Sequence, residues 1–229
     1  MQVKIDSLIE GARVAQGTVV VIDVYRAFTT AAVAFDRGVD KIYLTELPEE
    51  ALRLREQGVG DLCMGEVNGT KPEGFDFGNS PHELSQANVA GKTLVQSTRS
   101  GTVGVAAAEQ ATSTYVCSLA IASSTAKVLL RDTPAAVTIV AMGNKGVDRT
   151  DEDEVCALYL RNLLEGRQPD PAAVAAVASA GRDSLNFDDP DQPQYHPLDR
   201  EWALRVDYFP FAIRVVRERG LLVARAVSA

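Results

Sequence analysis

The chain has few of the residues that build disulfide frameworks or zinc sites. Its three cysteines, Cys63, Cys117 and Cys156, are odd in number and widely spaced, and no Cys-x-x-Cys pair occurs. This pattern argues against a disulfide framework and against a zinc knuckle. The two histidines, His82 and His196, lie far apart in the sequence. A zinc site built on histidine is therefore not expected either.

Long apolar runs and long basic runs are also absent. No stretch reaches the roughly 20 apolar residues that cross a bilayer, and residues 1–10 show no signal peptide. We therefore expect a cytoplasmic protein without a membrane partner. The 229 residues carry a net charge of −8, which repels nucleic acid. A pocket for an anion must then be built locally, from a cation, arginine side chains or backbone N–H groups.

What the sequence does contain is an alternation of strand-like and helix-like segments. Residues 17–23 are an apolar, β-branched run typical of a buried strand, and the Ala-rich residues 26–37 follow as a helix. Further strands are predicted at 40–44, 61–64, 93–97, 113–117 and 137–142, and further helices at 48–57, 101–110, 123–131 and 151–164. This alternation predicts an α/β fold with a largely parallel or mixed sheet flanked by helices.

We expect residues 1–229 to form one α/β domain, with a division into two lobes left open because residues 170–229 are less regular. A short helix is predicted at 171–180 and a turn region at 187–197. The mixed aromatic and basic residues 202–223 are expected to pack across the sheet. The oligomeric state is also open, and a homo-oligomer is one alternative.

Polar residues follow the ends of several predicted strands, where open α/β sheets bind ligands. Asp23 ends the first strand, Glu66 follows the strand at 61–64, and Lys145 follows the strand at 137–142. The strand at 93–97 runs into the hydroxyl-rich turn 97–102. If the sheet is parallel, these groups project from one edge of it.

Asp23 and Arg26 could bind a divalent cation and a phosphate respectively. Asp23 could equally be a cap of the following helix. In the turn 97–102, exposed N–H groups at a helix start favour an anion, and Arg99 adds a positive charge. An ordinary capped helix start is the alternative there.

The predicted helix 151–164 has an apolar stripe that continues into Glu152 and Asp153 at its first turn. Acidic residues at a helix start also complement the helix dipole, so both interpretations stay open. Lys145 is either a phosphate contact or a flexible surface residue. Cys156 lies inside the apolar stripe and is expected in the core rather than as a nucleophile.

Taken together, these segments resemble the 2-phosphosulfolactate phosphatase family. The matching stretches follow the family's order and are 21–27, Gly65-Glu66, the Gly-Phe-Asp-Phe-Gly-Asn-Ser-Pro string at 74–81, 97–102, and Glu152-Asp153 with Cys156-Ala157. The sequence departs from the family where Ser100 stands in place of a common Asn, with Arg99 before it.

The resemblance implies a family-specific α/β fold and a Mg²⁺-dependent hydrolysis of 2-phospho-3-sulfolactate to 3-sulfolactate and phosphate, a step towards coenzyme M. Its candidate metal ligands here are Asp23, Glu66, Glu152 and Asp153. Its candidate substrate contacts are Asn79, Ser97, Thr98, Gly101 and Thr102, to which we add Ser100 from the same turn and Lys145.

We therefore predict a Mg²⁺-dependent phosphatase of a small anionic phosphate ester, with Asp23, Arg26 and Arg99 as its catalytic residues. Asp23 would serve as a metal ligand or as a nucleophile, and the ligand role is favoured because Tyr25 stands where aspartyl-phosphate phosphatases carry a second Asp. The alternative is a non-catalytic module that binds an anionic metabolite in the same pocket.

Overall fold

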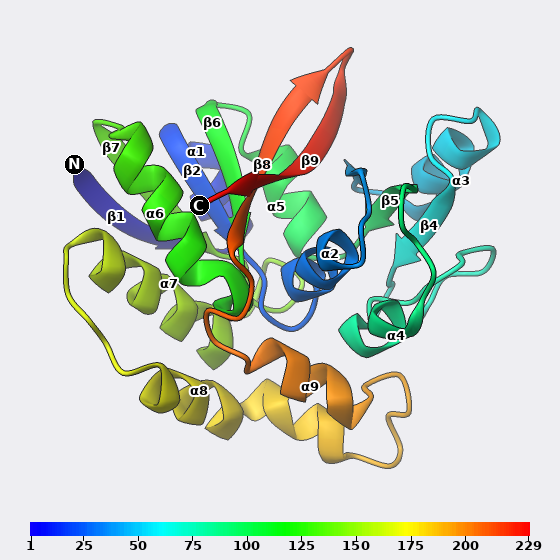
Figure 1. Cartoon of the computed structure of the whole chain (residues 1–229). Coiled ribbons are helices and arrows are strands. Elements are labelled where there is room, and N and C mark those ends of the chain that lie inside the picture. The colour runs from blue at the N-terminus through cyan, green and yellow to red at the C-terminus, as the bar shows by residue number, and fades with distance from the viewer.

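The computed structural model describes all residues from 1 to 229. A nine-stranded sheet runs through it in the order β1-β7-β2-β6-β8-β9-β3-β5-β4 (Figure 1). One parallel set comprises β1 (Gln2–Ser7), β7 (Ala136–Ala141), β2 (Gly17–Ile22) and β6 (Ala111–Cys117). A second parallel set comprises β3 (Lys41–Thr45), β5 (Thr93–Ser97) and β4 (Leu62–Gly65). The predicted α/β class with a parallel or mixed sheet is confirmed.

A hairpin from the end of the chain joins the two parallel sets. Its strands β8 (Phe211–Glu218) and β9 (Leu221–Ser228) pair antiparallel with each other, with β6 and with β3. Arg219 and Gly220 both have positive φ, as the tightest hairpin turns require. The expectation that residues 202–223 pack across the sheet is wrong, because this range contains all of β8 and the start of β9, which are strands of the sheet itself.

Helices cover both faces of the first parallel set. On one face α6 (Ala122–Asp132) packs on α7 (Asp151–Leu164), and α7 packs on β1, β7 and β2. On the other face α1 (Leu8–Val14) packs on α5 (Gly101–Ala107). Helix α5 ends at Ala107, so the helix predicted at 101–110 is shorter than expected. Helix α2 (Ala27–Asp36) leads from β2 to β3, and α3 (Pro48–Glu56) packs on the second set.

An outer layer lies below the sheet in the view of Figure 1. It contains α8 (Pro171–Ala180), the 3-10 helix η2 (Arg182–Asp188) and α9 (Pro197–Ala203), and α9 packs on α4 (Pro81–Gln86). Helix α4 begins with Pro81, and the Ser80 hydroxyl accepts a hydrogen bond from the Glu83 N–H at 3.0 Å. The short elements α1, α4 and α9 were not predicted from the sequence.

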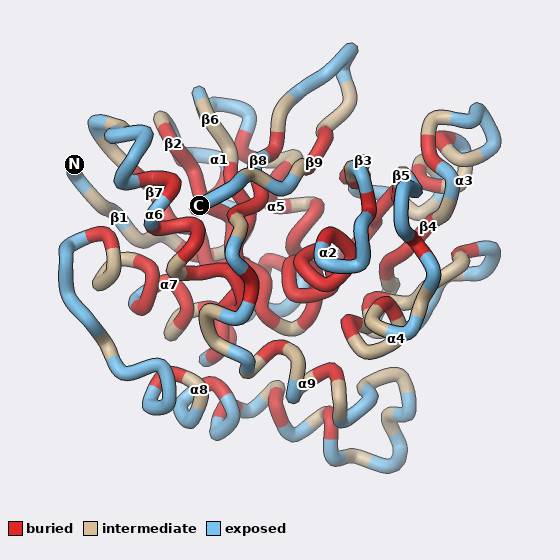
Figure 2. Tube along the Cα trace, viewed as in Figure 1, coloured by how far each residue is buried: buried red, intermediate tan, exposed pale blue.

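One apolar core runs through both strand sets. A single cluster of 51 buried hydrophobic residues reaches from Val137 in β7 to Ile42 in β3 and Ala224 in β9, so the hairpin is part of the core. Figure 2 shows this buried centre and the exposed outer turns. None of the helices combines the length and the apolar character that crossing a membrane requires.

Candidate active site

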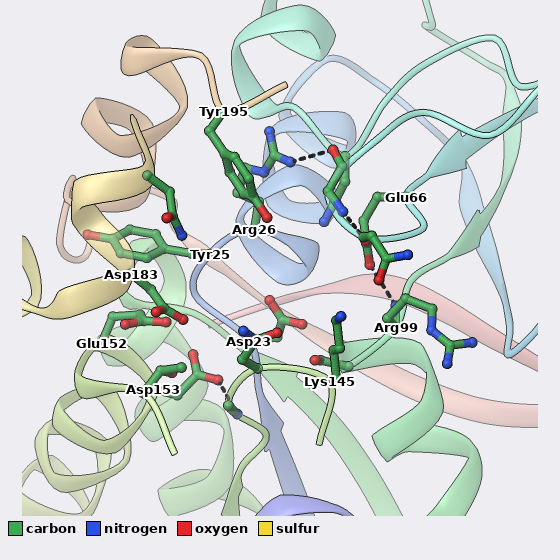
Figure 3. A pocket seen from close by; sticks show the side chains of 18 of the residues that line it. Asp23, Tyr25, Arg26, Glu66, Arg99, Lys145, Glu152, Asp153, Asp183 and Tyr195 are labelled. Carbon is green, nitrogen blue, oxygen red and sulfur yellow. Dashed lines mark hydrogen bonds between the residues drawn. The ribbon is translucent and has the colours of Figure 1, made fainter. Parts of the chain in front are cut away.

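A cavity of about 380 Å³ opens where the chain leaves β2, β4, β5 and β7 (Figure 3). Only three of its 21 lining residues are hydrophobic, so it suits a polar ligand. Most of the predicted site residues line it, and these are Asp23, Arg26, Glu66, Asn79, Arg99, Ser100, Lys145, Glu152 and Asp153.

These groups come together, but not at one edge of a uniformly parallel sheet as the sequence suggested. The three antiparallel steps through β8 and β9 make the two parallel sets run in opposite senses, so a uniformly parallel edge is wrong. Helix α5 brings residues of the two parallel sets together, because it begins just after β5 of one set and packs on β2 of the other. A Cβ on Gly101 would lie 2.9 Å from Asp23 Oδ2, and one on Gly104 would lie 2.3 Å from Met142 Sδ.

Asp23 lies at the centre of the cavity, with 5% of its surface exposed. Its Oδ1 accepts a 2.9 Å hydrogen bond from the N–H of Ala27, the first residue of α2. The side chain therefore supports the helix start and also faces the cavity. Burial raises the pKa of Asp23 to about 6, and the charge of Glu66 adds to this, while the N–H of Ala27 opposes it. Charge on this carboxylate thus needs a partner.

Asp153 ties two cavity loops together. Its Oδ1 accepts a 2.7 Å hydrogen bond from the Val24 N–H, and its Oδ2 accepts a 2.8 Å bond from the Gly143 N–H. Both oxygens are therefore engaged with the backbone. Burial, followed by the charges of Glu152 and Asp23, raises the pKa of Asp153 well above its usual range.

Glu66 has the same role on the opposite wall. Its Oε1 accepts from the Arg99 N–H and its Oε2 from the Gly69 N–H, both at 2.7 Å. The carboxylate therefore fixes the turn after β5 and the loop that contains Gly69.

Glu152 is the carboxylate with the least compensation. Only 2% of its surface is exposed, and its Oε2 has no hydrogen-bond partner. Burial raises the pKa of Glu152 to about 7; the Thr150 hydroxyl opposes this, and the charges of Asp183 and Asp23 add to it. A buried, unpartnered carboxylate oxygen is costly when it is charged, so a proton or a cation beside Glu152 would lower that cost.

Two cations at the rim are free of ion pairs. The side chains of Arg99 and Lys145 are exposed and make no salt bridge. Lys145 has φ +55° and stands between Gly143 and Gly146, which also have positive φ. This tight turn, anchored at Gly143 by Asp153, presents the lysine to the cavity (Figure 3).

Arg26 lines the cavity, but most of its N–H groups make hydrogen bonds within the protein. Its Nη1 donates to Asp199 Oδ2 and to the Gln194 carbonyl, each at 2.8 Å, and its Nη2 donates to the Gly69 carbonyl at 3.2 Å. The guanidinium also lies 4.8 Å from the centre of the Tyr195 ring. Three of its five N–H donors are thus occupied, which leaves two for an anionic ligand.

The hydroxyl-rich turn forms a support behind the cavity wall rather than the wall itself. Only Arg99 and Ser100 from it line the cavity, whereas Ser97, Thr98, Gly101 and Thr102 do not. The Thr102 hydroxyl donates to the Thr98 carbonyl and accepts from the Thr98 N–H, both at 2.9 Å. These bonds close the turn, so the predicted substrate contacts at the four buried positions are not supported by their placement.

Asn79, at the end of the long loop, is placed in the cavity as predicted. Its side chain is 5% exposed and its Oδ1 has no partner. An unpaired amide oxygen in such a place can accept from a ligand or hold a cation.

Sequence reasoning missed three further residues that line the cavity. Tyr25, Asp183 and Tyr195 line the cavity, and the latter two come from the segment that follows α8. Phe187 connects Tyr25 and Tyr195, with ring centroids 5.1 and 5.6 Å away respectively. The only sequence signal was a Pro- and Asp-rich turn region, which does not indicate where the turn lies.

The donors present fit a hard cation such as Mg²⁺. No group of three His, Cys, Asp or Glu side chains could hold a metal ion by itself, so the predicted four-carboxylate ligand set is not assembled. Mg²⁺, however, is usually held by one or two carboxylates together with water and phosphate oxygens. Asp23 and Glu152 meet that need, because Glu66 and Asp153 hold backbone N–H groups with both oxygens.

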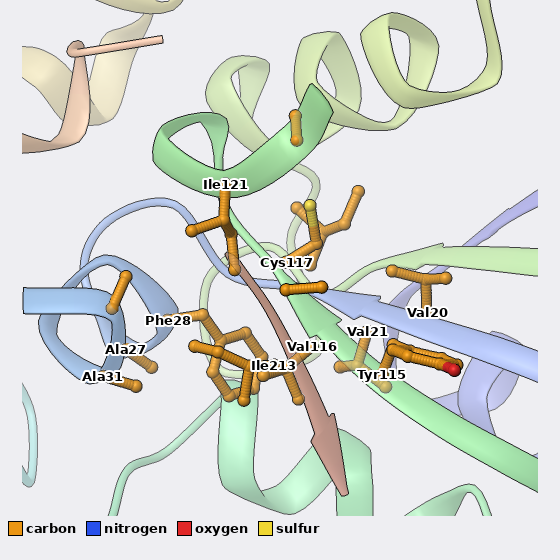
Figure 4. Packing of buried hydrophobic residues seen from close by; sticks show 14 of the residues in the cluster. Val20, Val21, Ala27, Phe28, Ala31, Tyr115, Val116, Cys117, Ile121 and Ile213 are labelled. Carbon is orange, nitrogen blue, oxygen red and sulfur yellow. The ribbon is translucent and has the colours of Figure 1, made fainter. Parts of the chain in front are cut away.

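The floor beneath Asp23 is rigid apolar packing. Phe28 and Ala31 of α2 lie against Val116 of β6 and Ile213 of β8 (Figure 4). Cys156 is fully buried in the same core, which confirms its structural role. Because interiors pack at close to crystal density, the turn that carries Asp23 rests on a firm base.

Comparison with known proteins agrees with this geometry. A probable 2-phosphosulfolactate phosphatase of Thermus thermophilus is 38% identical over 191 residues, which cover 81% of this chain and 79% of that protein. A protein of the same description from Bacillus subtilis is 32% identical over 204 residues, or 87% of each chain. One from Deinococcus radiodurans is 35% identical over 165 residues, or 70% of this chain and 69% of that protein.

The family model described as 2-phosphosulpholactate phosphatase matches residues 3–190. This stretch contains β1, apart from Gln2, to β7 and every carboxylate of the cavity discussed above. It ends between the cavity residues Asp183 and Tyr195. The chain belongs to the 2-phosphosulfolactate phosphatase family.

Proposed function

We propose that this protein is a Mg²⁺-dependent phosphatase of a small, multiply charged phosphate monoester. The substrate that its relatives' names describe, 2-phosphosulfolactate, is the one we propose, with 3-sulfolactate and phosphate as products on the way to coenzyme M. The observation that carries the proposal is one polar cavity that combines the buried carboxylates Asp23 and Glu152 with the unpaired cations Arg99 and Lys145.

Asp23 and Glu152 would hold the Mg²⁺, with water and phosphate oxygens as its other ligands. A bound Mg²⁺ neutralises phosphoryl oxygens and makes coordinated water more acidic. Both carboxylates have raised pKa values because they are buried, so a cation beside them relieves an existing cost. A metal-ligand role for Asp23 is favoured over a nucleophilic one because Tyr25 stands where aspartyl-phosphate phosphatases carry a second Asp.

Arg99 and Lys145 would attract the ester into an otherwise acidic molecule. Both lie at the rim, and neither has to break an ion pair to meet an anion. Phosphoryl transfer depends mainly on positioning and on charge stabilisation. In the overall reaction the oxygen of water bonds to phosphorus, the bond from phosphorus to the ester oxygen breaks, and that oxygen receives a proton.

A panel of small phospho-acids that includes 2-phospho-3-sulfolactate tests the proposal. We expect phosphate release with Mg²⁺ and none with EDTA, and a preference for esters that carry further acidic groups. If no ester releases phosphate with any divalent cation, the phosphatase proposal is wrong. Saturable binding of the same compounds in calorimetry without turnover would then identify a binding module.

A further inference from the structure

Asp199 is fully buried although it lies outside the cavity, and it connects two segments that contribute residues to the cavity wall. Its surface is 0% exposed. Its Oδ2 accepts from Arg26 Nη1 at 2.8 Å, while its Oδ1 accepts from the Ser80 hydroxyl at 2.6 Å and from the His82 N–H at 3.0 Å. One carboxylate in α9 thus holds the loop after β2 and the start of α4.

Two of these partners, Arg26 and Ser80, belong to the cavity wall or adjoin it in the chain. Arg26 itself lines the cavity and holds the carbonyl of Gly69, which lines it too. Ser80 follows Asn79, which lines the cavity and whose buried Oδ1 has no hydrogen-bond partner. Asp199 is therefore hydrogen-bonded to one cavity residue, Arg26, and to the chain neighbour of another, Asn79.

The arrangement leaves two N–H groups of Arg26 free to bind a ligand. Arg26 still has its Nε–H and one Nη2–H unused, since only three of its five donors make bonds within the protein. A flexible arginine without an acceptor behind it would have many orientations open to it. A bidentate or stacked guanidinium is useful only when its plane is fixed, and here Asp199 and Tyr195 fix it.

We propose that Asp199 is a positioning residue of this cavity, whose carboxylate fixes the Arg26 guanidinium so that its two free N–H groups meet the phosphate of an anionic ligand, and which also fixes the neighbouring Asn79–Ser80 segment. The kinetic part rests on the proposed phosphatase function. The binding part does not, because inorganic phosphate is the probe and needs no turnover.

The test compares Asp199→Asn with Asp188→Asn. Asparagine keeps an oxygen for Ser80 and His82 but no longer balances the charge of Arg26. Asp188 pairs with Arg200 on the same outer segment, is exposed and does not line the cavity. We expect Asp199→Asn to weaken the affinity for inorganic phosphate in calorimetry by about 10-fold or more and to raise KM, and Asp188→Asn to leave both unchanged.

A double variant separates positioning from folding. In Arg26→Met with Asp199→Asn, no unpaired charge stays buried, so the melting temperature should recover relative to Asp199→Asn alone. Phosphate affinity and KM should not recover. If Asp199→Asn only lowers the amount of folded protein while its KM and phosphate affinity stay those of the wild type, the positioning role is wrong. If instead the wild type binds phosphate but turns over no ester, the proposed function fails and the positioning role stands on the binding data.

Discussion

The backbone N–H of Arg99 donates a 2.7 Å hydrogen bond to the carboxylate of Glu66. This bond joins the chain just after β5 to the chain just after β4, and it places the free Arg99 side chain at the rim of the cavity. The other oxygen of Glu66 accepts from the Gly69 N–H. Glu66 therefore organises the wall rather than having a free carboxylate for a metal.

Replacing Glu66 by Ala should loosen this wall. Two backbone N–H groups lose their acceptor, and each lost bond of this kind costs about 1 kcal/mol or more. We expect an unfolding free energy lower by about 1–2 kcal/mol in urea titrations and a raised KM. Glu66→Gln keeps one acceptor oxygen and should lie between Glu66→Ala and the wild type; equal impairment in the two variants would point to a direct metal role.

Asp23→Asn should separate activity from stability. The change removes the central carboxylate of the cavity, so Mg²⁺-dependent phosphate release should fall by about 10²-fold or more. Because it also removes a buried charge that Glu66 repels, the metal-free variant should melt at or above the temperature of the wild type. Full activity in this variant would exclude Asp23 from the site.

The metal-free protein should become less stable as the pH rises from 5 to 8. A carboxyl group whose pKa is higher in the folded chain stabilises the fold while protonated, and that contribution is lost as the pH passes its folded pKa. Burial raises the pKa of Asp23 from 3.8 to about 6 and that of Glu152 from 4.5 to about 7. Above pH 5 the decline should span about one pH unit for Asp23 and about two for Glu152, so the loss should be on the order of 4 kcal/mol and be complete near pH 7.

Thermal melts in EDTA and in Mg²⁺ measure this effect. Added Mg²⁺ should flatten the decline, because the cation compensates the ionised carboxylates, and its stabilising effect should be larger at pH 8 than at pH 5. An equally steep decline in the Asp23→Asn, Glu152→Gln double variant would show that other groups cause it.

The rim cations should act on the substrate without affecting the fold. Neither Arg99→Ala nor Lys145→Ala breaks an ion pair, so the unfolding free energy should change by less than about 0.5 kcal/mol. We expect kcat/KM to fall by about 10-fold for each, with weaker salt dependence than the wild type. Lys127, an exposed lysine of α6 outside the cavity, provides the matched control, and its Ala variant should behave as the wild type.

Gly101→Ala should displace Asp23. The new Cβ would lie 2.9 Å from Asp23 Oδ2 and 3.0 Å from Phe28 Cζ, which is closer than side chains tolerate. We expect a loss of about 1–3 kcal/mol in unfolding free energy together with reduced Mg²⁺ binding. Wild-type Mg²⁺ affinity in a variant that stays folded would show that Asp23 does not depend on this close approach.

The sequence predicted the elements whose burial is uniform. Residues 19–22 are apolar throughout because β2 is covered on both faces, and such runs are typical of buried strands. Strand β8 was missed because its exposed Arg214 and Arg217 interrupt the apolar pattern. The early residues of β1 are likewise half exposed at the edge of the sheet.

The candidate site divides in the same way. Asp23, Glu152 and Asp153 stand out because a charge directly continues an apolar run, which is visible in one stretch of sequence. Asp199 is separated from Arg26 by 173 positions, and its place in the first turn of α9 resembles ordinary dipole compensation. Nothing local distinguishes it, so only the folded chain reveals its partner.

The β8–β9 hairpin follows every other strand in the sequence, yet it occupies the middle of the sheet. Until it inserts, β6 and β3 each present an unpaired edge, and such edges invite pairing with other chains. The cavity draws Asp23 and Glu152 from one strand set and Glu66 and Arg99 from the other. During synthesis on the ribosome, the pocket can therefore be completed only after β8 and β9 have emerged, so its assembly depends on contacts between residues far apart in the sequence.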